Sequence, residues 1–145
     1  MLNLKFVKLQ TKHASIASYL RQTDIDEVTA MTGLSPEVAV AYSIAHTERG
    51  FAVELDGRPV VLFGVSGDMI WCVGTDDVTQ HPITFYRMSK KIIPILKEGR
   101  TYLENYVDER NKLYLKWLKW AGFHIDEPMR IGNGFFHKIW WRKES

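Results

Sequence analysis

Apolar and polar positions alternate at the start of the chain, as they do in a strand with one buried face. Leu2, Leu4 and Phe6 lie at every second position, and this period of two predicts a half-buried strand over residues 2–8. Beyond it the apolar spacing becomes helical. We expect helical segments over 13–22, over 23–33 with Thr23 as N-cap, and over 36–47 with Ser35 as N-cap.

The period returns to two after Gly50, and three strands then follow one another. We expect them over 51–55, 59–65 and 69–74. Asp56-Gly57 and Gly67-Asp68 connect them, and Asp-Gly is typical of a hairpin turn. Strands joined by such short turns pair antiparallel, so this part should be a meander, followed by a polar loop over 76–82.

The second half alternates between helices and strands. We expect a helix over 83–97, which Pro94 should kink or shorten, a strand over 101–108 and a helix from Asn111 to Ala121 that Gly122 ends. Two strands, 123–130 and 135–142, close the chain. A helix between the fourth and fifth strands implies a right-handed crossover and at least one parallel pair. The fold class is therefore α/β, in the α+β form with a mixed sheet.

Composition is that of one folded domain over residues 1–145. The chain is 46% hydrophobic and 25% charged, and its length fits a single domain. No apolar run approaches the roughly 18 residues of a membrane helix, and Lys5 and Lys8 interrupt the N-terminus before a signal-peptide core could form. The lone Cys72 is typical of a buried thiol. These features predict a reduced, cytoplasmic setting without a membrane.

Charge and tryptophan are unevenly distributed. The first 80 residues carry 6 basic and 10 acidic side chains, whereas the other 65 carry 13 and 7. This asymmetry is typical either of solvated helices or of an anion-binding surface.

Four tryptophans lie among basic residues in the second half of the chain: Trp117, Trp120, Trp140 and Trp141. Trp140 and Trp141 are neighbours, so they must point to opposite faces of a strand. We expect core packing and an exposed Trp that meets a protein partner or a second copy, with nucleic acid as the weaker alternative. The five histidines show no metal spacing, so no metal is expected.

The order of the expected elements, with Asn111 and Gly122-Phe123 at the two ends of one helix, resembles the GCN5-related N-acetyltransferases (GNAT). In that family an Asn opens the penultimate helix and Gly-Phe follows it. The resemblance implies a GNAT-like fold of about seven strands, with N-terminal helices, a central helix and a penultimate helix. It also implies acetyl-CoA as cofactor.

A narrower pattern is similar to small bacteriophage proteins of this fold, including the internal virion protein A type of T7-like phages. The residues that carry it are Trp71, Thr75, Asp76, Asn111, Tyr114, Trp117, Leu118, Lys119 and Gly122. This resemblance implies a phage protein in the host cytoplasm or in the virion, with a virion or host protein as partner.

The GNAT resemblance places the cofactor loop at residues 81–90. Family members hold the pyrophosphate on backbone N–H groups of a glycine-rich turn at the start of the central helix, but this segment contains no glycine. The resemblance therefore points to other cofactor-binding residues: Thr84, Arg87, Lys90, Lys91 and Asn111. Seven residues after this Asn the family often has a Tyr that protonates the thiolate of the coenzyme. This chain has Leu118 at that position. Tyr114, one turn earlier on the same helix face, is therefore the candidate acid. The candidate general bases are His46, Glu48, Glu54 and Glu104.

Two hypotheses follow. The first is an acyl-CoA-dependent N-acyltransferase with an atypical cofactor loop and an unknown acceptor, whose site lies between strands 69–74 and 101–108. The second is a non-enzymatic phage protein that uses the fold for virion assembly or host-protein binding. The fold favours the first hypothesis, whereas the missing glycines and the surplus aromatic side chains favour the second.

Overall fold

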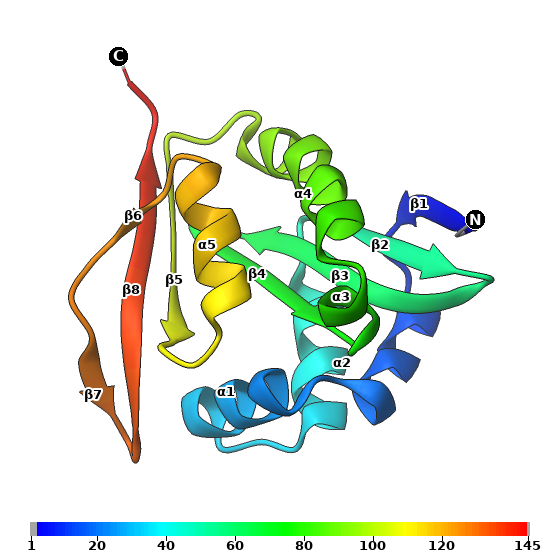
Figure 1. Cartoon of the computed structure of the whole chain (residues 1–145), viewed down its shortest axis with the longest axis horizontal. Coiled ribbons are helices and arrows are strands. Elements are labelled where there is room, and N and C mark those ends of the chain that lie inside the picture. Colours follow the sequence, from blue (N-terminus) through cyan, green and yellow to red (C-terminus); the bar gives the residue numbers. More distant parts are fainter. Residues whose placement is uncertain (1–2, 145) are drawn as a thin grey trace.

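The computed structural model describes residues 3–144 and consists of one mixed sheet with helices on both faces (Figure 1). The strands are β1 (Leu4–Lys8), β2 (Arg49–Leu55), β3 (Arg58–Ser66), β4 (Met69–Gly74), β5 (Tyr102–Asp108), β6 (His124–Ile125), β7 (Met129–Ile131) and β8 (Gly134–Arg142). The helices are the 3-10 helix η1 (Thr11–Tyr19), α1 (Gln22–Thr32), α2 (Pro36–His46), α3 (Asp77–Gln80), α4 (Pro82–Lys97) and α5 (Lys112–Trp120).

The sheet confirms the predicted mixed α+β class. Its order is β1-β2-β3-β4-β5-β8-β6, with β7 paired to β8. β4 and β5 are parallel, and the other neighbouring strands are antiparallel. The expected strand over 123–130 is two strands, because Pro128, which has no N–H to donate, lies in the break between them. The sheet therefore has eight strands rather than about seven.

Three local predictions were wrong. α1 begins at Gln22 with Arg21 at the N-cap position, so Thr23 lies in the first turn, where its hydroxyl accepts a hydrogen bond from Arg21 Nη2. Pro94 does not shorten α4, because it falls in the last turns, where buried Ile92, Ile93 and Leu96 hold the helix against the sheet. The expected polar loop over 76–82 contains the short helix α3.

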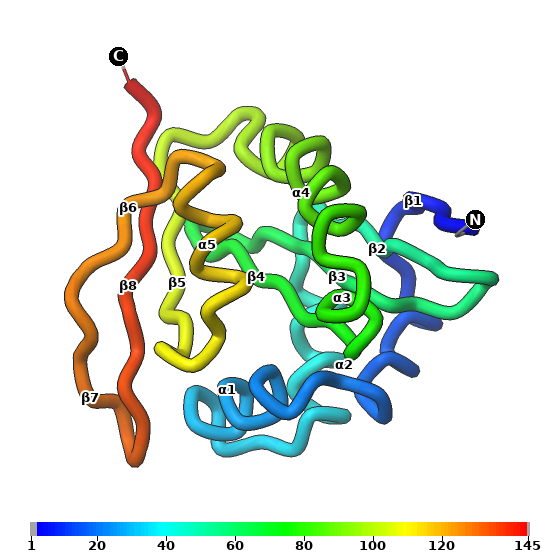
Figure 2. Tube along the Cα trace, in the orientation of Figure 1, coloured from blue at the N-terminus to red at the C-terminus, as the bar shows by residue number. Residues whose placement is uncertain are grey.

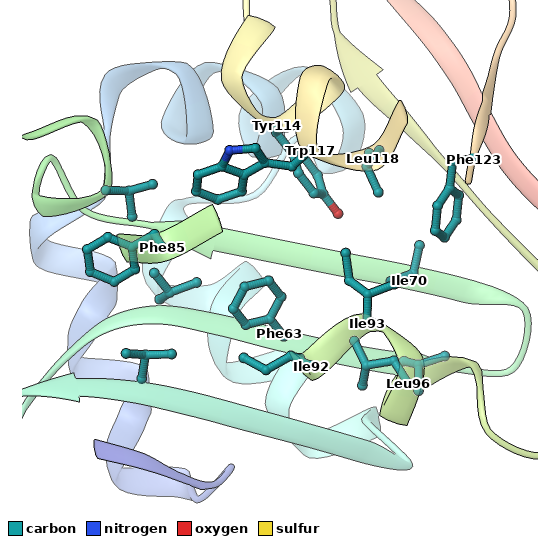
Figure 3. Packing of buried hydrophobic residues seen from close by; sticks show 14 of the residues in the cluster. Phe63, Ile70, Phe85, Ile92, Ile93, Leu96, Tyr114, Trp117, Leu118 and Phe123 are labelled. Atoms are coloured by element: carbon teal, nitrogen blue, oxygen red, sulfur yellow. The ribbon is translucent and has the colours of Figure 1, made fainter. Parts of the chain in front are cut away.

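Each face of the sheet has its own core. α4 and α5 cover one face, where Phe63 and Ile70 of the sheet meet Phe85, Leu96 and Leu118 (Figure 3). The other core joins the sheet to η1 and to α2 through apolar side chains: Ile16, Ala17, Leu20, Val40, Ala52, Leu62 and Val73. The neighbouring tryptophans of β8 have different partners: Trp141 packs against the first core, whereas Trp140 stacks on His124, with 4.2 Å between ring centroids. Both are half-buried, so neither is the exposed tryptophan that was expected at this pair.

Among residues 3–144 no helix is long and apolar enough to cross a membrane.

Candidate active site

β4 and β5 diverge from a single point of contact. They pair only where Met69 faces Glu104, and the Asn105 side-chain amide donates to the carbonyl of Ile70 at 2.6 Å at the next step. Beyond that point the strands run apart, and α5 lies in front of the space between them (Figures 1 and 2). Side chains at or near the N-terminal ends of α1 and α5 lie at this space.

Four of these side chains form a polar group that we call the acid–amide cluster: Arg21, Asp24, Glu27 and Asn111. The backbone N–H of Gly74, at the end of β4, donates to Asp24 Oδ2 at 3.0 Å. Asn111 Nδ2 donates to Glu27 Oε2 at 3.3 Å and lies 3.5 Å from Asp24 Oδ1. Arg21 Nη2 donates to Asn111 Oδ1 at 3.1 Å. Asn111 therefore ties both carboxylates of α1 to the start of α5.

Burial raises the pKa of both carboxyl groups in the cluster. Desolvation is the main cause for Asp24 and brings its pKa to about 6, although the Arg21 charge and the Gly74 N–H oppose it. The pKa of Glu27 rises to about 8, first through desolvation and then through repulsion from Asp24. At neutral pH, therefore, the two neighbouring carboxyl groups share about one proton, and Asp24 is the more easily ionised of the two.

A small inner cavity of about 10 Å³ adjoins the cluster. Its lining residues are Arg21, Asp24, Val61, Cys72, Gly74, Val78, Asn111, Tyr114 and Trp117. Burial is the main cause that raises the pKa of the Cys72 thiol and of the Tyr114 phenol. Both groups are therefore protonated at neutral pH, and burial makes each of them a weaker acid than it is in water.

An outer groove of about 190 Å³ lies between α4 and α5. Its lining residues are Tyr86, Ser89, Lys90, Ile93, Pro94, Lys97, Trp117, Trp120 and Ala121. Tyr86 and Trp120 meet edge to face with 4.6 Å between ring centroids. Lys90 Nζ lies 5.6 Å from the centre of the Tyr86 ring. The groove thus combines aromatic surface with positive charge, a combination suited to a planar anionic ligand.

The structure separates the residues that the sequence proposed for the site. Asn111 and Tyr114 line the inner cavity, and Lys90 lines the outer groove. Within residues 3–144, Thr84, Arg87 and Lys91 line neither space: Thr84 is half-buried in the first turn of α4, and the other two are exposed farther along it. Their proposed contact with a cofactor stays a prediction.

The four candidate bases lie elsewhere, each in a local contact. His46 Nδ1 bonds the carbonyl of Tyr42, Glu48 pairs with Arg100, Glu54 with buried His13, and Glu104 with Tyr102 and Lys138. None of them lines the inner cavity or the outer groove in the described chain. The sequence analysis did not single out Asp24 and Glu27, which lie near the start of the helix expected over 23–33. Their spacing of three residues, which puts them on one helix face, was the available signal.

Within residues 3–144, no group of three or more His, Cys, Asp or Glu side chains could hold a metal ion.

Solved structures with the same arrangement of elements are acetyltransferases. One is a proposed acetyltransferase from Acinetobacter baylyi ADP1, with a TM-score of 0.68, 12% identity, and coverage of 99% of this chain and 94% of that one. Another is a GNAT-family acetyltransferase from Streptococcus pneumoniae, with a TM-score of 0.64, 10% identity, and coverage of 97% and 100%. A third is the aminoglycoside acetyltransferase AAC(6')-Ib in complex with coenzyme A, with a TM-score of 0.62, 13% identity, and coverage of 97% and 95%.

The fold is that of the GNAT acetyltransferases. At these identities the likeness establishes the GNAT fold and leaves the activity open, because one fold supports many functions. No protein-family model and no curated protein matches the sequence. The comparisons add nothing to the narrower resemblance to phage proteins, which stays a hypothesis.

Proposed function

We propose that the protein is an N-acyltransferase that takes its acyl group from acetyl-CoA or a related thioester. The observation that carries the proposal is the pair of carboxyl groups with raised pKa, Asp24 and Glu27, held by Asn111 where β4 and β5 diverge. Carboxyl groups whose pKa values are shifted toward neutrality at a cleft are typical of acid–base sites.

Each group of the site has a role in proton transfer. Acetyl-CoA supplies an acyl group on sulfur, so the acceptor nitrogen must lose a proton and the sulfur must gain one. Asp24, ionised at neutral pH, is the group that accepts the proton, at Oδ1, while the Gly74 N–H holds Oδ2. Tyr114, which is protonated at neutral pH and lines the inner cavity, is the group that donates one. Glu27 can return a proton to the cluster, since its pKa of about 8 keeps it mostly protonated.

The outer groove has room for part of such a thioester, whereas the inner cavity does not. The outer groove offers Lys90 for phosphate oxygens and the exposed Trp120 ring for stacking. At the start of α4 the N–H groups of Ile83 and Thr84 point out of the first turn, but Pro82 has none, so the helix offers one donor fewer to an anion. The inner cavity is too small for an acyl group while the surrounding side chains keep their positions. We therefore assign the nucleotide end to the outer groove.

Calorimetric titration with acetyl-CoA tests the proposal. We expect micromolar binding that weakens about tenfold in Lys90→Glu, which reverses the charge on the groove. Lys5→Glu, an exposed position on β1, is the matched control and should bind as the wild type does. Loss of thioester absorbance with a panel of diamines, aminoglycosides and peptides then identifies the acceptor, and Asp24→Asn should abolish that loss. Absence of binding at millimolar acetyl-CoA contradicts the proposal.

A different observation favours a second candidate, a protein-binding role. The outer surface of α1 and α2 exposes apolar side chains along neighbouring turns: Met31, Leu34, Val38 and Tyr42. Val38 and Tyr42 are more than half exposed and one helical turn apart. Apolar surface of this kind is typical of protein interfaces. In the phage hypothesis its partner is a virion or host protein, and a second copy of the chain is the alternative. Sedimentation of the wild type and of Val38→Glu/Tyr42→Glu distinguishes self-association from a monomer.

A further inference from the structure

We propose that Trp117 is a gating residue that separates the outer groove from the acid–amide cluster and so decides how large an acyl group can reach it. This inference rests on the proposed acyl-CoA site, but part of its test does not. Trp117 lines both the outer groove and the inner cavity. A ligand that runs from Lys90 toward Asp24 therefore meets the indole ring of Trp117.

The ring is buried and well packed. Trp117 is 4% exposed, and Figure 3 shows it and Tyr114 projecting from α5 into the layer of side chains that includes Phe85, Ile92 and Ile93. α5 is only 9 residues long, and Trp117 lies three residues before its last one. Moving the ring leaves the backbone hydrogen bonds of α5 in place and costs only the packing of the ring in this layer.

The volumes on the two sides of the ring show what it excludes. The outer groove measures about 190 Å³, whereas the inner cavity measures about 10 Å³. A single water molecule already needs about 10–15 Å³. With Trp117 in place the cluster is therefore closed to a thioester, and a shorter side chain at this position joins the two spaces.

Cys72 provides a readout that does not depend on acyl-CoA. It is the only cysteine of the chain, it is half-buried, and it lines the inner cavity together with Trp117. An uncharged thiol reagent such as N-ethylmaleimide modifies it faster when the space around the thiol is widened. The rate at which Cys72 is labelled in the folded protein, relative to the wild type, thus reports how far a change at Trp117 opens this space.

We would compare Trp117→Leu and Trp117→Phe with Trp120→Leu, which alters the outer groove but not the inner cavity. We expect Cys72 to be labelled about tenfold faster in Trp117→Leu than in the wild type, with a weak dependence on urea, because only a local opening is needed. Trp120→Leu should stay within about twofold of the wild type. Trp117→Phe, the smaller change, keeps the test informative if the Leu variant does not fold.

Two results overturn the gate. One is equal labelling of Cys72 in the Trp117 variants and the wild type. The other is faster labelling that follows urea as steeply as global unfolding does, because that traces to lost stability rather than to an opened passage.

Affinity for acyl-CoA of different chain length connects the gate to the proposed function. Butanoyl-CoA should gain about tenfold over acetyl-CoA in Trp117→Leu relative to the wild type. Faster Cys72 labelling without any CoA binding keeps the gate and refutes the acyltransferase. Acetyl-CoA binding with unchanged labelling and unchanged chain-length preference keeps the acyltransferase and refutes the gate.

Discussion

Glu27→Gln should remove much of the pH dependence of the protein's stability between pH 5 and 9. The pKa of Glu27 is raised from 4.5 to about 8 in the folded state. A carboxyl group with a raised pKa binds more protons folded than unfolded, so stability is greatest below the unfolded pKa and falls as the pH rises through the folded one. The glutamine side chain of this variant keeps an acceptor for Asn111 but has no charge to gain.

The size of the effect follows from the shift. At about 1.4 kcal/mol per pKa unit, the rise from 4.5 to about 8 corresponds to an upper bound of about 5 kcal/mol lost between pH 5 and 9. The ionisation of Asp24, whose pKa is about 6, lowers the protein's free energy of unfolding in the lower part of the same pH window. Repulsion from Asp24 is one of the causes that raise the pKa of Glu27, so the contributions of the two carboxyl groups are not additive.

Urea unfolding followed by tryptophan fluorescence at pH 5, 6, 7, 8 and 9 measures the effect. The wild type should lose about 2–5 kcal/mol across this range and Glu27→Gln less than half of that amount. Glu37→Gln, an exposed acid in the first turn of α2, is the control and should follow the wild type. Parallel pH profiles for the wild type and Glu27→Gln, or a wild type that grows more stable toward pH 9, refute the reasoning.

Three further substitutions test other parts of the structure by urea unfolding. Gly64→Ala should destabilise the protein by about 1–3 kcal/mol, because the new Cβ overlaps the Trp71 indole ring, and an unchanged midpoint contradicts that packing. His13→Leu should lose about 1–3 kcal/mol, since Glu54 Oε2 lies 2.9 Å from His13 Nε2 and its carboxylate is largely buried, whereas a gain in stability shows that this pair is dispensable. Pro94→Ala should stabilise by up to about 3 kcal/mol by restoring a donor for the Lys90 carbonyl, and a loss of stability indicates that the proline ring is needed for packing.

Periodicity predicted the helices of this fold where one face is buried. Phe85, Ile92 and Leu96 in α4 are buried and repeat with the helical period, whereas Phe6, which alternates with Leu4 in β1, is exposed. Turn chemistry placed the meander, since Asp56-Gly57 has two residues with positive φ at the turn between β2 and β3. The helix predicted over 83–97 ends at Lys97 as expected, but Pro94 does not shorten it, because buried side chains of α4 outweigh the local effect of the proline.

The site was less predictable because its key groups are distant in sequence. Asn111 and Tyr114 were singled out through the family pattern, and they line the inner cavity. The spacing of Asp24 and Glu27 puts them on one helix face, but their raised pKa values come from burial against segments about 50 and 87 residues away, which the sequence does not show. The position of Trp117 as a wall between two spaces likewise depends on how α4 and α5 pack.

Chemical-shift mapping by NMR with coenzyme A tests the central claim most directly. Backbone amide shifts recorded during a titration locate the ligand without requiring an acceptor. The account predicts that the largest changes fall on residues 82–97 of α4 and 112–121 in and after α5, with Tyr86, Lys90 and Trp120 among them. An absence of changes at millimolar coenzyme A, or changes confined to the outer surface of α1 and α2, would contradict the acyltransferase and favour the protein-binding role.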